Sequence, residues 1–262
     1  MQHDAGIEYL LRSDNRTAVL LELEQDQPLD RYGIEDRLNA SRRTVTRVLG
    51  DLTEQGYIRE SAVGYRLTTF GAIVADAYRQ CRERTDIATR YRSFLANVDS
   101  ETADFDPQYL EDADLTVATD VNPYAPRHRM LELRQSASWI RAVMPVIEKR
   151  SIEQLTGRVK SDDDLTFEVV IPADLYEMIQ SHPEYDESFR AATAADSVKN
   201  FVYPGPITTL YAVTDDIAAL GASVDGEPHA LVESPNPELR EWVTRRIDTY
   251  QDEAIPLEAY RQ

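Results

Sequence analysis

The stretch over residues 41–68 constrains the fold more than any other part of this 262-residue chain. Its first half repeats apolar residues at helical spacing, with Ser41 placed to cap the start of the helix and Gly56 placed to end it. Two short strand patterns then flank a turn at Gly64. We therefore predict a helix from Ser41 to about Gln55, followed by a β-hairpin. The inward face of this helix consists of Val45, Val48, Leu49 and Leu52.

Further helical patterns lie on both sides of this stretch. Two precede it, over residues 5–24, with a break near residues 13–15, and over residues 30–38. Another follows it, over residues 69–98. Helices followed by two strands around a glycine turn are the order of a winged helix-turn-helix. We therefore predict that residues 1–98 form such a domain, ending in a long linker or dimerisation helix.

The outward face of the helix that begins at Ser41 carries side chains that suit DNA. Arginine can bridge O6 and N7 of guanine or hold a phosphate, and serine and threonine bind phosphate oxygens. No acidic residue interrupts the run from Ser41 to Arg47. The alternative is that these arginines only solvate one face of a small helical domain, and the order of the elements favours DNA. The predicted DNA-binding residues are Ser41, Arg42, Arg43, Thr44, Thr46 and Arg47 on the helix, and Arg59 and Arg66 on the wing.

The second part of the chain alternates between strand and helix patterns. An acidic, irregular segment over residues 99–107 separates it from the first part. The early alternation predicts some parallel strands, and closely spaced strands at the end predict antiparallel pairing. The predicted fold class is thus a two-domain α+β or α/β chain, with a mixed α/β sheet domain over residues 99–262. Its predicted strands span residues 115–119, 139–143, 165–171, 198–203, 210–213, 217–221 and 229–232, and its predicted helices span 127–136, 146–156, 172–181, 187–195 and 236–250.

Charge is distributed unevenly between the two parts. The formal net charge is −19, which taken alone argues against a nucleic-acid partner. However, residues 1–95 carry 14 basic and 15 acidic side chains, a net of −1, so residues 96–262 carry the remaining −18. This asymmetry is typical of a DNA-binding part joined to a separate acidic part. Only three of the 28 basic residues are lysines, and this lysine-poor, acidic composition is typical of a protein from a halophile.

Two groups of segments resemble a known family. Residues 38–49 followed by 52–58 resemble the recognition helix and first wing strand of archaeal winged-helix regulators. Residues 118–126 and 230–237 resemble the sensor domain of the methanogenesis-regulator type of archaeal transcription factor, which is common in haloarchaea. The resemblance covers nearly the whole chain and implies a regulator with a C-terminal sensor domain.

Polar residues after two predicted strands form a candidate effector site. Ligands of open α/β sheets bind beyond the carboxyl ends of strands, and the segment after residue 119 offers a carboxylate, an amide and a phenol there. The alternative is that Asn122-Pro123 is only a turn and that Asp120 is only a helix cap. Both interpretations stay open. The predicted effector-binding residues are Asp120, Asn122, Tyr124, Arg127 and Tyr203.

The helix predicted over residues 69–98 also offers apolar surface for a homodimer. A two-fold dimer would present two recognition helices to a pseudo-palindromic DNA site. Packing of this helix on its own domain is the alternative. The predicted dimerisation residues are Tyr78, Ile87, Tyr91, Phe94 and Leu95.

The sequence contains no arrangement of residues that indicates catalysis. It has no glycine-rich phosphate loop and no nucleophile elbow, and its four histidines have no metal-ligand spacing. We therefore predict no enzyme, no catalytic residue, no metal and no cofactor. No apolar run matches a bilayer, and the N-terminus lacks the pattern of a secretory signal, so we expect a cytoplasmic protein without a membrane partner.

The function that these patterns favour is sequence-specific transcriptional regulation. The expected partners are double-stranded promoter DNA, a second copy of the chain and a small-molecule effector bound by the C-terminal domain. One alternative is a DNA-binding scaffold whose C-terminal domain only dimerises or binds a protein partner. The other is an enzyme of unknown reaction.

Overall fold

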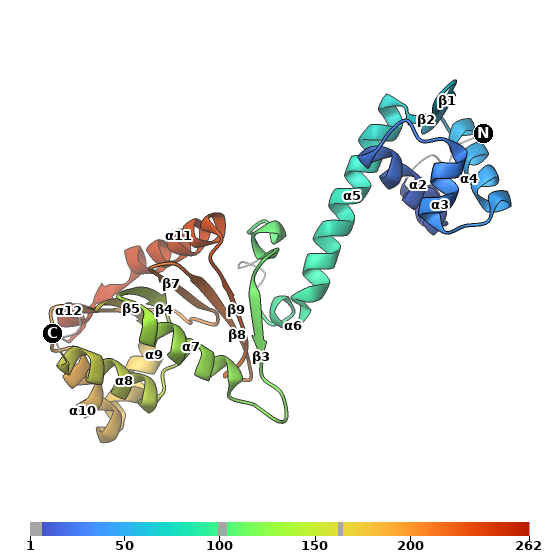
Figure 1. The fold of residues 1–262 in the computed structure, drawn as a ribbon. Helices are drawn as coiled ribbons and strands as arrows, with labels where there is room; N and C mark the ends of the chain where they lie inside the picture. Colours follow the sequence, from blue (N-terminus) through green and yellow to red (C-terminus); the bar gives the residue numbers. More distant parts are fainter. Residues whose placement is uncertain (1–6, 99–103, 162–164, 262) are drawn as a thin grey trace. The chain divides into compact units, whose positions relative to one another are not determined.

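The computed structural model describes residues 7–98, 104–161 and 165–261. The chain divides into two compact units, Met1–Asp86 and Ile87–Gln262. The first is helical with a small hairpin and the second is built on a large mixed sheet, so the predicted fold class is confirmed (Figure 1). The division falls within the helix predicted over residues 69–98 rather than after it. Residues 99–103, at the predicted boundary, lie outside the described residues.

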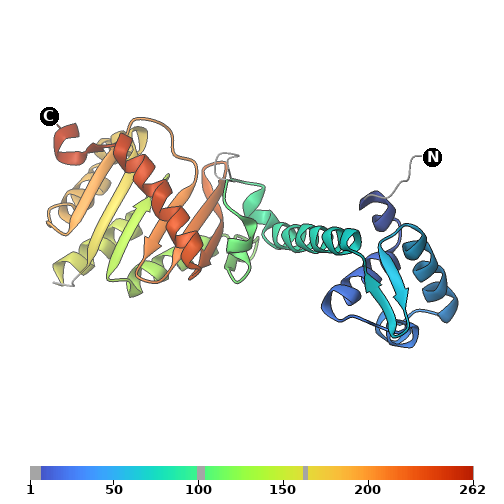
Figure 2. The same ribbon diagram turned by 90° about the horizontal axis from the view of Figure 1, so that it is seen from above.

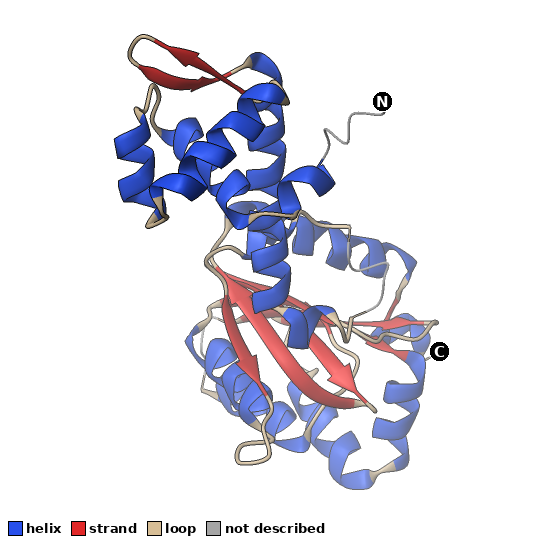
Figure 3. Cartoon of the chain, turned by 90° about the vertical axis from the view of Figure 1, so that its right-hand side faces the viewer, coloured by secondary structure: helices blue, strands red, loops and turns tan. Residues whose placement is uncertain are grey.

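The first unit contains the predicted helices and hairpin in the predicted order. The hairpin is the two-stranded element shown in red at the top of Figure 3. One buried core joins all these elements, because each helix turns an apolar face inward. The elements are α1 (Ile7–Leu11), α2 (Asp14–Gln25), α3 (Arg31–Leu38), α4 (Arg42–Glu54), β1 (Ile58–Ser61), β2 (Gly64–Leu67) and α5 (Thr69–Arg90).

Gly64 fixes the position of the hairpin within this unit. Its φ of +128° lies in the region that favours glycine. A Cβ at this position would lie 2.5 Å from the carbonyl oxygen of Leu29, so any larger residue would displace the backbone. Next to it, Tyr65 and Leu29 exchange two backbone hydrogen bonds of 2.8 and 3.2 Å. The segment before α3 therefore holds the turn end of β2.

The second unit is an eight-stranded sheet covered by helices. Its strand order is β10-β6-β5-β4-β7-β8-β9-β3, in which β4, β5 and β6 are parallel and the other pairs are antiparallel, as the spacing of the patterns predicted. The strands are β3 (Asp114–Val117), β4 (Trp139–Val143), β5 (Thr166–Pro172), β6 (Val198–Tyr203), β7 (Leu210–Thr214), β8 (Ala218–Val224), β9 (Glu227–Ser234) and β10 (Ile255–Pro256). The helices are α6 (Arg92–Leu95), the 3-10 helix η2 (Pro107–Leu110), α7 (Ala125–Ser136), α8 (Lys149–Lys160), α9 (Ala173–Ser181), α10 (Pro183–Ala192), α11 (Pro237–Glu253) and α12 (Leu257–Tyr260).

Alternating side chains of the central strands build two cores, one on each face of the sheet. On β5, Phe167, Val169 and Ile171 enter the core beneath α7, α8, α9 and α10, whereas Val170 enters the opposite core. Helix α11 covers that opposite face, along which it runs in Figure 2. None of the described helices is both long and apolar enough to cross a bilayer.

The helix predicted over residues 69–98 is interrupted at Tyr91. The backbone of Tyr91 leaves the helical region, and the short helix α6 starts after it. Ile87, Tyr91 and Phe94 are all buried in the core of the second unit, and the Tyr91 hydroxyl donates a hydrogen bond to the Ala113 carbonyl oxygen. The packing of these side chains into the core favours the break in the helix at Tyr91. Helical periodicity in the sequence cannot predict such a break.

Candidate nucleic-acid interface

Helix α4 presents its first two turns to solvent. Ser41 caps the helix, and its Oγ accepts a hydrogen bond from the Thr44 backbone N–H at 3.3 Å. The four apolar residues of the inward face are buried, as predicted. The outward residues are exposed except for Thr44, which is half-buried. The start of α4 thus offers a helix N-terminus together with arginine and threonine side chains, a combination that attracts phosphate.

Four of the five predicted DNA-binding arginines have no ion-pair partner among the described residues. They are Arg42, Arg43, Arg59 and Arg66. The fifth, Arg47, is paired through Nη1 with a carboxylate oxygen of Asp51 at 3.3 Å, and the same carboxylate also binds Arg16 at 3.1 Å. Because Asp51 is shared with Arg16, its ion pair with Arg47 is weak, and the Arg47 side chain is 59% exposed.

The hairpin places two of the unpaired arginines side by side. Arg59 on β1 lies directly opposite Arg66 on β2 in the antiparallel register. Like charges directly opposite each other destabilise a sheet, so the two arginines do not stabilise the hairpin. An anion bound between the strands would convert the repulsion into attraction, and a DNA phosphate is such an anion.

The predicted effector residues do not form one site. Asp120, Asn122 and Tyr124 lie on an exposed loop after β3, and Asn122 accepts a backbone bond from Thr119 in a local turn. Tyr203 lies on β6, and five strands lie between β6 and β3 in the sheet order. The structure therefore separates Tyr203 from the other four predicted residues, whereas the Arg127 guanidinium lies over the Tyr124 ring, 5.4 Å from its centroid.

The other two predicted effector residues are engaged within the protein. The Arg127 guanidinium binds the carboxylates of Glu148, at 2.6 Å, and Glu227. The Tyr203 ring packs edge-on against Tyr250, with centroids 5.0 Å apart. Arg127 does line a cavity beneath α7.

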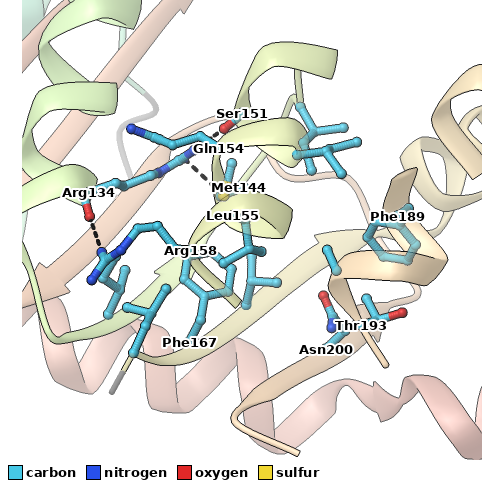
Figure 4. A pocket seen from close by; sticks show the side chains of 16 residues that line it. Arg134, Met144, Ser151, Gln154, Leu155, Arg158, Phe167, Phe189, Thr193 and Asn200 are labelled. Carbon is cyan, nitrogen blue, oxygen red and sulfur yellow. Dashed lines mark hydrogen bonds between the residues drawn. The ribbon is translucent and has the colours of Figure 1, made fainter. Parts of the chain in front are cut away.

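A cavity that the sequence analysis missed lies between the sheet and helices α7, α8 and α10. The cavity is narrow, and part of it is open to solvent (Figure 4). Its lining is mostly apolar, and it includes Arg134 on α7 and Asn200 on β6. Burial lowers the pKa of Arg134 to about 10, partly offset by the charge of Glu148. One sequence signal could have revealed this cavity: Arg134 falls on the apolar face of its helix, with Met130, Leu133 and Ala137.

The predicted dimerisation residues divide into two groups. Ile87, Tyr91 and Phe94 are buried in the core of the second unit, which neither the predicted dimer nor the alternative of packing on residues 1–98 anticipated. Tyr78 and Leu95 are half-buried. On α5, the exposed apolar side chains are instead Phe70, at 42%, and Ile73, at 67%.

Comparison with known proteins finds family similarity in both units. The family model for the middle domain of the methanogenesis regulatory protein FilR1 matches residues 123–253, half of the chain. The model for the N-terminal domain of HVO_A0261 matches residues 4–90. No curated protein matches the chain.

Similarity to solved structures is weak. TrmBL2, an archaeal chromatin protein whose structure shows a novel mode of DNA binding, is 10% identical, with 97% of this chain and 100% of that chain covered and a TM-score of 0.39. A putative O-methyltransferase from Nostoc punctiforme is 14% identical, with 76% and 63% covered and a TM-score of 0.25. The methyltransferase SibL is 14% identical, with 75% and 62% covered and a TM-score of 0.25. At these scores the likenesses carry no argument about fold or function.

Proposed function

The chain belongs to the family of archaeal regulators defined by the middle domain of the methanogenesis regulatory protein FilR1, and from this premise we propose that it is a sequence-specific, DNA-binding transcriptional regulator. The observation that carries the proposal is the set of unpaired arginines on α4 and the hairpin. In a chain of net charge −19, carboxylates are abundant, yet none of Arg42, Arg43, Arg59 and Arg66 forms an ion pair with a described carboxylate. They remain available for an external anion.

The geometry of α4 supports readout in the major groove. Its first two turns carry the outward side chains, and the N-terminal residues of a recognition helix are those that contact base edges. Arg43 and Arg47 lie four residues apart on the same face, so both can reach the same groove. The hairpin arginines would contact the flanking phosphates as a wing.

The proposed regulator acts as a homodimer that responds to a small molecule. Dimerisation doubles the DNA contact area and matches a pseudo-palindromic operator. Phe70 and Ile73 on α5 provide the apolar surface for this contact, because other apolar residues of the predicted helix are taken up by the second core. The second unit, which matches the FilR1 domain, provides the effector site.

Genome-wide enrichment of bound DNA tests the proposed function. Chromatin immunoprecipitation of the intact protein should give sharp peaks near promoters. The triple variant Arg42→Ala, Arg43→Ala, Arg47→Ala should lose them, because it removes both base-reading and phosphate-binding groups from α4. The matched control is Arg82→Ala, which removes an exposed arginine from α5. Peaks that survive in the triple variant, or peaks absent from the intact protein under several growth conditions, would contradict the proposal.

A further inference from the structure

We propose that the cavity around Arg134 binds a small organic carboxylate with an elongated apolar body, and that this compound is the effector. The inference rests on the proposed regulatory function, for which it names the site and the class of ligand. It is carried by a half-buried arginine without a carboxylate partner among the described residues at one end of the cavity, a buried asparagine whose side chain has no described hydrogen-bond partner at the other, and an apolar surface between them (Figure 4).

Arg134 has no carboxylate partner among the described residues. Its guanidinium donates to the Ser151 hydroxyl and, at 3.3 Å, to the thioether sulfur of Met144, which is a weak acceptor. Glu148 is the carboxylate that acts on it electrostatically, and Arg127 already binds Glu148 at 2.6 Å. A charge that is partly withdrawn from water and has no counter-ion at hydrogen-bond distance is costly, so an incoming anion would gain by supplying one.

The second arginine of the cavity serves a different purpose. Arg158 donates through Nη1 to the carbonyl oxygens of Arg134 and Ala137, at 2.6 and 2.7 Å. These carbonyls end α7, so Arg158 acts as a C-terminal cap of that helix. The cavity therefore offers one cation that is not already committed to the protein, which matches a ligand with a single negative charge.

Asn200 marks the other end of the cavity. It is 5% exposed, and no described residue forms a hydrogen bond with its side chain. Amides of buried residues are nearly always hydrogen-bonded, so an amide without a described protein partner is available to bond a ligand. In Figure 4 Asn200 lies beside Thr193, on the side of the cavity away from Arg134. Together they offer a polar group on the ligand both a donor and an acceptor.

The surface between the two ends is apolar and sets the length of the ligand. It includes Leu155 on α8, Phe167 on β5 and Phe189 on α10. Arg134 contacts Met144, which follows β4, whereas Asn200 lies on β6; β5 separates these strands, so the two ends are about 10 Å apart. A phosphate ester carries a charge of about −2, which one guanidinium cannot neutralise. A carboxylate carries a single negative charge, and its two oxygens match the two N–H groups of the guanidinium fork.

Direct binding of octanoate to the full-length protein tests the inference. Octanoate joins a carboxylate to an apolar chain of suitable length, so it tests the Arg134 end and the apolar surface without engaging Asn200, and octanamide is its uncharged counterpart. Isothermal titration should show saturable binding of octanoate that is at least about tenfold tighter than that of octanamide. Arg134→Gln should remove this preference, Arg134→Lys should restore part of it, and Arg150→Gln, which removes an exposed charge from α8, should leave it intact.

Two further results decide the question. Leu155→Trp keeps Arg134 but fills the cavity, so it should abolish octanoate binding even if Arg134→Gln fails to fold. No saturable binding to the intact protein, or equal affinity for acid and amide, would overturn the inference. The titration uses no DNA. Failed binding with intact promoter enrichment therefore rejects only the effector site, whereas octanoate binding without enrichment rejects only the proposed regulator.

Discussion

At the scale of single residues, the sequence predicted those side chains whose role depends on local geometry. Ser41 caps α4 as expected, because a cap needs only its own helix. The sequence could not show that Tyr203 lies apart from the other predicted effector residues, because a pocket depends on which other elements lie above a loop. Arg134 was missed for the same reason: in the sequence it is one more arginine of a helix, and only the packing of α7 on α8 buries it.

Gly64 provides a stability test at this scale. Gly64→Ala should destabilise the first unit by at least about 1–3 kcal/mol, because alanine is strained at this φ and its Cβ meets the Leu29 carbonyl. Gly50→Ala is the matched control: Gly50 lies in α4 with open space around it, so alanine there should stabilise by about 0.5–1 kcal/mol. Calorimetric unfolding of both variants checks the signs. Equal effects would contradict the proposed close contact at Gly64.

At the scale of elements, hydrophobic periodicity predicted most helices and strands and their order. Parallel and antiparallel pairing also followed from the spacing between strands, since parallel neighbours need a crossover. The prediction failed at the long helix over residues 69–98. An apolar stripe shows that one face of a helix is buried, but it does not show which element buries that face. The sequence therefore could not predict that Tyr91 and Phe94 pack into the core of the second unit.

The exposed stripe on α5 yields a prediction about assembly. If Phe70 and Ile73 form the dimer contact, Ile73→Glu should convert dimer to monomer, because it buries an unpaired charge in the interface. Ala72→Glu adds the same charge at the neighbouring exposed position and should leave the dimer intact. Sedimentation equilibrium measures both masses. A wild-type monomer, or a dimer that tolerates Ile73→Glu, would contradict this contact.

At the scale of the whole molecule, charge separates the proposed functions of the two units. Nearly all of the net charge lies beyond residue 95, which leaves the DNA-binding unit almost neutral overall with its unpaired arginines on α4 and the hairpin. The composition predicts a halophile, and in concentrated salt the release of counterions from DNA contributes little to affinity. Direct contacts between arginines and bases should then supply most of the specificity.

The affinity of purified protein for an enriched promoter duplex tests the central claim most directly. Fluorescence anisotropy in high potassium chloride should show that Arg43→Ala and Arg47→Ala each cost about 1–3 kcal/mol of specific binding, whereas Arg82→Ala costs nothing measurable. That result would establish α4 as the recognition helix. If Arg43→Ala and Arg47→Ala both bind the duplex as tightly as the intact protein, α4 does not read the DNA and the account is wrong.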